Sequence, residues 1–97
     1  MINYEELLKC GVKAKNNEEY EQAVRYFAKA LQANKTDSKP WFYRANIYNH
    51  SLKNYESALK DYNEAIKLKS DDEFYYYNRA LCCLNLGDAD RALADYN

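Results

Sequence analysis

Residues 41–65 read WFYRANIYNHSLKNYESALKDYNEA, a stretch in which alanines and aromatic residues recur at helical spacings. The same pattern returns on both sides of it, in steps of 34 or 35 residues by subtraction. Three sets of positions carry the recurrence: Gly11, Ala45 and Ala80; Ala23, Ala58 and Ala92; Phe27, Tyr62 and Tyr96. A period near 34 with small and aromatic residues in fixed places predicts an array of helical repeats. Such arrays build extended surfaces for partners.

Length and composition fit one small helical domain. The chain has 97 residues, 47% of them hydrophobic and 30% charged, with only two glycines and one proline. This composition predicts an almost wholly helical, all-α fold with a modest core. No stretch approaches the ~20 apolar residues of a membrane span, and the first residues, MINYEE, lack the basic and then apolar pattern of a secretory signal. We therefore expect a cytoplasmic protein that contacts no membrane.

Charge, cysteine and histidine content argue against several classes of function. The net charge of -1 leaves no basic excess for phosphates, so we expect no nucleic-acid partner. Cys10, Cys82, Cys83 and His50 do not offer four zinc ligands at workable spacing, which predicts no metal and no cofactor. The cysteines are interpreted as reduced thiols that act as small apolar residues. No set of residues fits nucleophile, base and orienting roles, so we expect no enzyme.

Apolar periodicity and capping residues predict six helices. The expected ranges are 4–16, 19–34, 39–50, 55–69 and 73–86, with a sixth helix from about residue 89 to the end. Asn3 and Glu6 fit a capping box, and Gly87 suits the end of the fifth helix. Short turns favour antiparallel pairs. One extra residue in the segment 49–54, compared with the first repeat, predicts a longer or distorted turn there.

The segments resemble tetratricopeptide repeats over nearly the whole chain. The matching residues are Leu7, Gly11, Ala14, Tyr20, Ala23, Phe27 and Ala30, then Trp41, Ala45, Tyr48, Tyr55, Ala58, Tyr62 and Ala65, then Tyr76, Ala80, Cys83, Ala89, Ala92 and Tyr96. The proline usual after the second helix of a repeat is replaced by Lys35 and Ser70. The resemblance implies a single domain, 1–97, built as a right-handed solenoid of antiparallel helix pairs. Its two and a half to three repeats would cover residues 4–37, 38–72 and 73–97, the last truncated.

The resemblance also implies that the first helix of each pair lines a concave groove, which makes an adaptor or scaffold that binds a peptide segment of a partner protein. The candidate ligand-binding residues are Leu8, Val12, Phe42, Tyr43, Asn46, Asn49, Phe74, Tyr77, Asn78 and Leu81. The full list of groove-facing residues is largely uncharged and also includes Glu5, Lys9, Asn16, Lys39 and Asn85. It combines aromatic anchors with amides that can donate to and accept from a peptide backbone. The alternative for any one of them is packing against a neighbouring helix.

Some members of the family hold the C-terminal carboxylate of chaperones with lysines, an arginine and asparagines. The equivalent positions here are Leu8, Val12, Tyr43, Phe74 and Asn78. None of them supplies a cation, and a buried carboxylate without a charged partner is costly. We therefore expect no binding of a chaperone tail by that type of clamp.

The third repeat stops before the positions that would match Ala30 and Ala65. Because arrays end with a polar capping element, we expect the chain to be a fragment of a longer repeat protein. The alternative is a structural self-association module, a homo-oligomer formed through the exposed C-terminal repeat.

Overall fold

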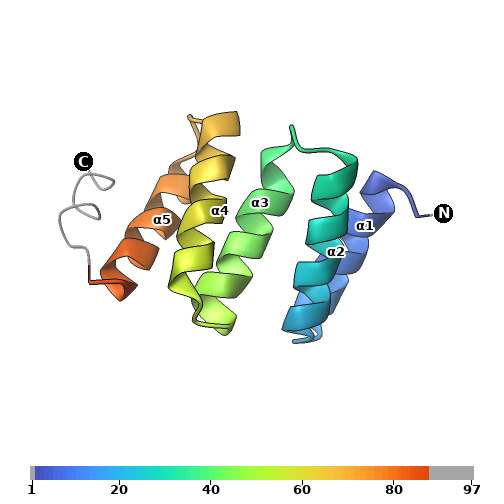
Figure 1. Ribbon diagram of the computed structural model, residues 1–97, viewed down its shortest axis with the longest axis horizontal. Coiled ribbons are helices and arrows are strands. Elements are labelled where there is room, and N and C mark those ends of the chain that lie inside the picture. The colour runs from blue at the N-terminus through green and yellow to red at the C-terminus, as the bar shows by residue number, and fades with distance from the viewer. Residues whose placement is uncertain (1, 88–97) are drawn as a thin grey trace.

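The computed structural model describes residues 2–87 and shows consecutive antiparallel helices side by side (Figure 1). The helices are α1 (Tyr4–Asn16), α2 (Tyr20–Ala33), α3 (Ser38–Asn46), α4 (Tyr55–Leu68) and α5 (Glu73–Asn85), with a π-helical turn, η1 (Ile47–Ser51), that continues α3. Within residues 2–87 no strand is present. The first five predicted helices are confirmed, the first with the predicted ends and the others with ends shifted by at most four residues. The sixth lies outside the described residues.

Short side chains begin four of the five helices. Asn3 Oδ1 accepts a hydrogen bond from the Glu6 amide at 2.9 Å, as the capping pattern predicts. Asp37, Asn54 and Asp72 accept from the backbone two or three residues later at the starts of α3, α4 and α5. These local bonds mark where four of the helices begin, whereas α2 starts without a side-chain cap.

The predicted small and aromatic positions form the core. Ala23, Phe27, Ala58 and Tyr62 have no solvent exposure. A Cβ placed on Gly11 would lie 2.5 Å from a ring carbon of Phe27, so only glycine lets α1 come this close to the ring. Large side chains set against small ones therefore determine the spacing of the helix pairs.

Two core positions differ from the sequence prediction. Tyr76 is the tyrosine that matches the repeat pattern in the sequence, but Tyr75 is the buried one, 4% exposed. The Tyr75 hydroxyl lies 2.8 Å from Ser38 Oγ, which is also buried, so the two polar groups satisfy each other. Tyr76 is half-buried and donates a hydrogen bond to the Ser70 carbonyl at 2.8 Å.

The extra residue of the second repeat is absorbed in η1 rather than in a longer loop. The Leu52 amide donates to the Ile47 carbonyl five residues earlier at 2.9 Å, which is the π-helical pattern. Lys53 then adopts a left-handed backbone, with φ 57°, and closes the turn without a glycine. The expected distortion is present, and it turns Ile47 and Asn49 into the interior, each 1% exposed.

The described helices form an elongated body of 45 × 25 × 17 Å, with α1 and α5 at opposite ends (Figure 1). Each helix packs chiefly against its neighbours along the chain. Within residues 2–87, no helix combines the length and the apolar character needed to cross a membrane.

Candidate functional site

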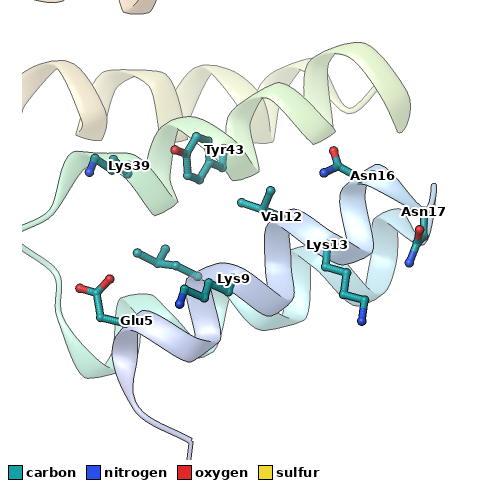
Figure 2. Close-up of a pocket in the computed structure, with 9 residues that line it drawn as sticks. Glu5, Lys9, Val12, Lys13, Asn16, Asn17, Lys39 and Tyr43 are labelled. Carbon is teal, nitrogen blue, oxygen red and sulfur yellow. The ribbon is translucent and has the colours of Figure 1, made fainter.

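A groove of about 440 Å³ lies between α1 and α3 (Figure 2). Its lining residues are Glu5, Leu8, Lys9, Val12, Lys13, Asn16, Asn17, Lys39 and Tyr43. Three of the ten predicted ligand-binding residues, Leu8, Val12 and Tyr43, meet here from two helices. Val12 on α1 points toward α3, where Tyr43 lies on the other side of the groove (Figure 2).

The floor of the groove is apolar and anchored in the core. Leu8 and Val12 follow the buried Leu7 and Gly11 by one residue, which turns them about 100° round α1, toward α3. Both pack against the core cluster that contains Phe27. The Tyr43 ring packs on Phe27 as well, with ring centroids 5.5 Å apart. All three are half-buried, so they have surface left to offer a ligand.

The rim of the groove is basic. Lys9, Lys13 and Lys39 line it and are exposed, against the single carboxylate of Glu5. No ion pair within residues 2–87 includes any of the three lysines. Lys9 and Lys39 were predicted to face the groove and Lys13 was not, so this part of the groove is more basic than the sequence indicated.

Phe42 is used by the core rather than by the open groove. Its ring stacks on Tyr75, with centroids 4.4 Å apart and planes 29° apart, and lies 6.0 Å from the Tyr62 ring. It is half-buried and joins two core clusters. The structure gives this residue the packing role that the sequence left open as an alternative.

The predicted asparagines hydrogen-bond within the protein. Asn46 Oδ1 accepts from the Tyr62 hydroxyl, and burial raises the pKa of that hydroxyl, which keeps its proton in place. Asn78 donates to the Phe74 carbonyl at 2.8 Å, and its Oδ1 lies 3.2 Å from His50 Nε2. These bonds hold the two half-buried amides in fixed orientations.

Asn49 is not on the surface of the groove. It is 1% exposed, and its Oδ1 accepts from Asn85 Nδ2 at 3.1 Å. Its own Nδ2 has no acceptor in hydrogen-bond geometry. The Asn49 amide still lies near the Tyr62 hydroxyl and lowers the pKa of that hydroxyl, against the larger effect of burial, which raises it. The prediction that Asn49 lines the open groove is wrong, because the π-helical turn rotates this residue inward.

A second open area lies on α5. Phe74 is 73% exposed and Tyr77 is 52% exposed, both large values for aromatic side chains. Leu81, one turn further along the same helix, is half-buried. These three predicted residues share one helix face, at i, i+3 and i+7, apart from the lysine cluster on α1 and α3.

A polar cluster formed by α3, α4 and α5 was not predicted from the sequence. The Arg44 guanidinium donates two hydrogen bonds to Asp61, at 2.7 and 2.9 Å, and lies 5.4 Å from the Trp41 ring. Burial lowers the pKa of Arg44, but the hydrogen bonds and the attraction to Asp61 raise it more, so the pKa of Arg44 is raised. The pKa of Asp61 is also raised, because the effect of burial exceeds the lowering effect of Arg44. Arg79 lies over the Tyr76 ring in the same way, at 5.4 Å. The sequence contains a sign of this cluster, because the pair of an aromatic residue and an arginine, Trp41 and Arg44, recurs 35 residues later as Tyr76 and Arg79.

The protein consists of antiparallel helix pairs that approach one another at small residues, and a groove opens between the first helices of two neighbouring pairs. These features define a helical repeat protein of the solenoid class. Two family descriptions match the chain: "TPR repeat" over residues 49–87 and "Tetratricopeptide repeat" over residues 14–37. The chain belongs to the tetratricopeptide repeat family.

Similar proteins come from yeast and from an archaeon. The chain is 28% identical to "Heat shock protein STI1" of Saccharomyces cerevisiae over 95 residues, which are 98% of this chain and 16% of that protein. It is 33% identical over 69 residues to "TPR repeat-containing protein MJ1428" of Methanocaldococcus jannaschii, with 71% of this chain and 12% of that protein covered. The chain thus spans a sixth or less of the length of these curated relatives.

Among solved structures, the first TPR of Spaghetti (RPAP3) bound to the HSP90 peptide SRMEEVD superposes with a TM-score of 0.89. The two are 26% identical, and the match covers 93% of this chain and 71% of that one.

Proposed function

We propose that this chain is a protein-interaction module that binds an extended segment of a partner protein in the groove between α1 and α3. The observation that carries the proposal is the groove itself, about 440 Å³ with an apolar floor and a polar rim. A similar repeat domain was solved with a peptide bound, which supports this class of ligand.

The floor provides the affinity. Leu8, Val12 and Tyr43 are held in place by their contacts with the Phe27 cluster, so they lose little freedom when a ligand side chain covers them. An apolar side chain of the partner would displace water from this floor and gain about 25 cal/mol for each Å² buried. The exposed ring of Phe74 on α5 offers a second anchor for a longer segment.

The chaperone-tail ligand stays excluded in this proposal. The five positions that match the family's clamp carry no cation, and the lysines of the groove stand at other positions. We expect a peptide ending in EEVD to bind no better through its terminal carboxylate than the same peptide with a terminal amide.

Two further parts of the proposal concern class and location. We assign the module no catalytic activity, since the sequence offers no nucleophile with a base and an orienting group. We place it in a reducing compartment such as the cytoplasm, because Cys10, Cys82 and Cys83 are free thiols.

Val12→Ala tests the site, with Val24→Ala as its matched control. Both valines are half-buried and pack on the same core cluster, but only Val12 lines the groove. Peptides are first selected by the full chain from a random displayed library. Val12→Ala should then weaken their binding by about fivefold, the worth of roughly 1 kcal/mol of lost apolar contact, and Val24→Ala should leave it unchanged. Equal effects of the two variants, or a library that yields no binder, would contradict the proposal.

The alternative function, self-association through the C-terminal repeat, depends largely on residues 88–97, which lie outside the described residues. Light scattering over a range of concentrations tests it. A mass that stays at one chain at every concentration would rule it out.

A further inference from the structure

We infer that the groove between α1 and α3 selects an acidic internal segment, in which one aliphatic side chain is flanked by glutamates or aspartates. The inference rests on the proposed function and adds the chemistry of the ligand. It also commits to one source of negative charge, namely side-chain carboxylates within a chain rather than a free C-terminus.

The groove carries positive charge that no carboxylate of the described residues pairs with. Lys9, Lys13 and Lys39 come from two helices and line one groove, while Glu5 is the only carboxylate among its lining residues. None of them is in an ion pair within the part of the chain that the structure describes. The whole chain has a net charge of -1, so this excess of positive charge is local. Like charges gathered without partners favour an anionic ligand.

The lysines of the groove surround an apolar floor. Leu8, Val12 and Tyr43 form the floor. Lys9 and Lys13 come from α1 and Lys39 from α3 (Figure 2). A segment lying along the floor would therefore have ammonium groups to either side. Carboxylates placed on both sides of a buried aliphatic residue match this geometry. Basic segments would be repelled.

The three lysines are exposed to solvent, and this exposure limits how much each of them contributes to the affinity for an acidic peptide. Exposed ion pairs contribute little singly, so each lysine should change the affinity by roughly 1.5- to 5-fold. Reversal of all three charges should change it by about ten- to a hundredfold, since attraction becomes repulsion. The attraction is also screened by salt, because the Debye length falls from about 10 Å at 0.1 M to about 3 Å at 1 M.

The experiment is a paired selection. The full chain and its variant K9E/K13E/K39E are each used to select from a display library of random twelve-residue peptides whose C-termini are fused to the carrier. The wild-type chain should enrich aspartate and glutamate around an aliphatic position, and the variant should enrich lysine and arginine there. A control variant, K29E/K35E/K69E, carries the same change in net charge on exposed lysines outside the groove and should select the same peptides as wild type.

Synthetic peptides then measure the effect. The probe is a fluorescein-labelled peptide with a blocked N-terminus, a C-terminal amide and the core Glu-Glu-Leu-Glu-Glu. Fluorescence anisotropy should show binding that weakens with salt. The affinity should fall at least about threefold when glutamine replaces the glutamates, and at least about tenfold in K9E/K13E/K39E. Circular dichroism checks that both triple variants keep their helical content.

The possible failures are distinct. A library that yields no binder for the wild-type chain removes the proposed function together with this inference. Selected peptides without acidic enrichment, or binding that K29E/K35E/K69E weakens as much as K9E/K13E/K39E does, overturn the inference and leave the proposed function standing. A probe that binds only when its C-terminal amide is replaced by a free carboxylate also overturns the inference, because the groove would then read a chain end.

Discussion

Gly11→Ala should destabilise the protein although alanine is the better helix former. The added Cβ would lie 2.5, 2.7 and 2.8 Å from three ring carbons of Phe27. Phe27 has no solvent exposure and packs on the Tyr43 ring, so it has no open space to move into. Overpacking of this kind costs roughly 1–3 kcal/mol, and the helix propensity of alanine offsets about 0.5–1 kcal/mol of it.

The midpoints of these two ranges leave a net loss of about 1 kcal/mol, which lowers the Tm of a domain of this size by roughly 4–8 °C. Urea and thermal unfolding followed by circular dichroism measure this loss of stability. The same measurement is repeated with Gly11→Ala introduced into a Phe27→Leu variant. Leucine removes the ring carbons that clash, so Gly11→Ala should be neutral or stabilising in that background. A stabilising effect of Gly11→Ala in the wild-type chain would refute the reasoning. So would the same cost with and without the ring.

Three further predictions concern other parts of the molecule. Arg44→Ala should cost roughly 2–4 kcal/mol in urea unfolding because it leaves the Asp61 carboxylate buried without its partner, and the double variant with leucine at both positions should recover most of this loss. At pH 8 a thiol reagent should label Cys10 quickly and the two buried cysteines only slowly, since burial raises the pKa of Cys82 to about 11; three equally fast thiols in the native protein would contradict this. Phe74→Ala should change the free energy of unfolding by less than about 0.5 kcal/mol, because the ring is 73% exposed, yet weaken the binding of selected peptides if they reach α5; a large loss of stability would show that the ring packs in the core.

The fold could be predicted from the sequence because its signals are redundant. The 34- and 35-residue steps, the caps at Asn3 and Asp72 and the scarcity of glycine all indicate the same helix pairs. The extra residue before Tyr55 also gave a correct expectation of a distorted turn. Its form could not be predicted, because a bulge within the helix and a longer loop both absorb one residue.

The site was harder to predict because each error came from a rotation of about one residue. An insertion turns the following side chain by about 100°, and η1 moved Asn49 from the expected groove into the core. Tyr75 was missed because three consecutive tyrosines carry no apolar periodicity that singles out the buried one. Lys13 fell between the predicted core stripe and the predicted groove, so the basic rim went unnoticed.

The row-like order of the helices has a consequence for motion. Because α1 packs chiefly on α2, it can detach from that one neighbour without disturbing the centre of the array. Amide hydrogens of α1 should therefore exchange with solvent faster than those of α4, which has helices on both sides. A segment that touches both α1 and α3 would hold the outer helix down, so ligand binding should slow exchange in α1 most of all. Of the described helices, α1 would then be the one that ligand binding stabilises most.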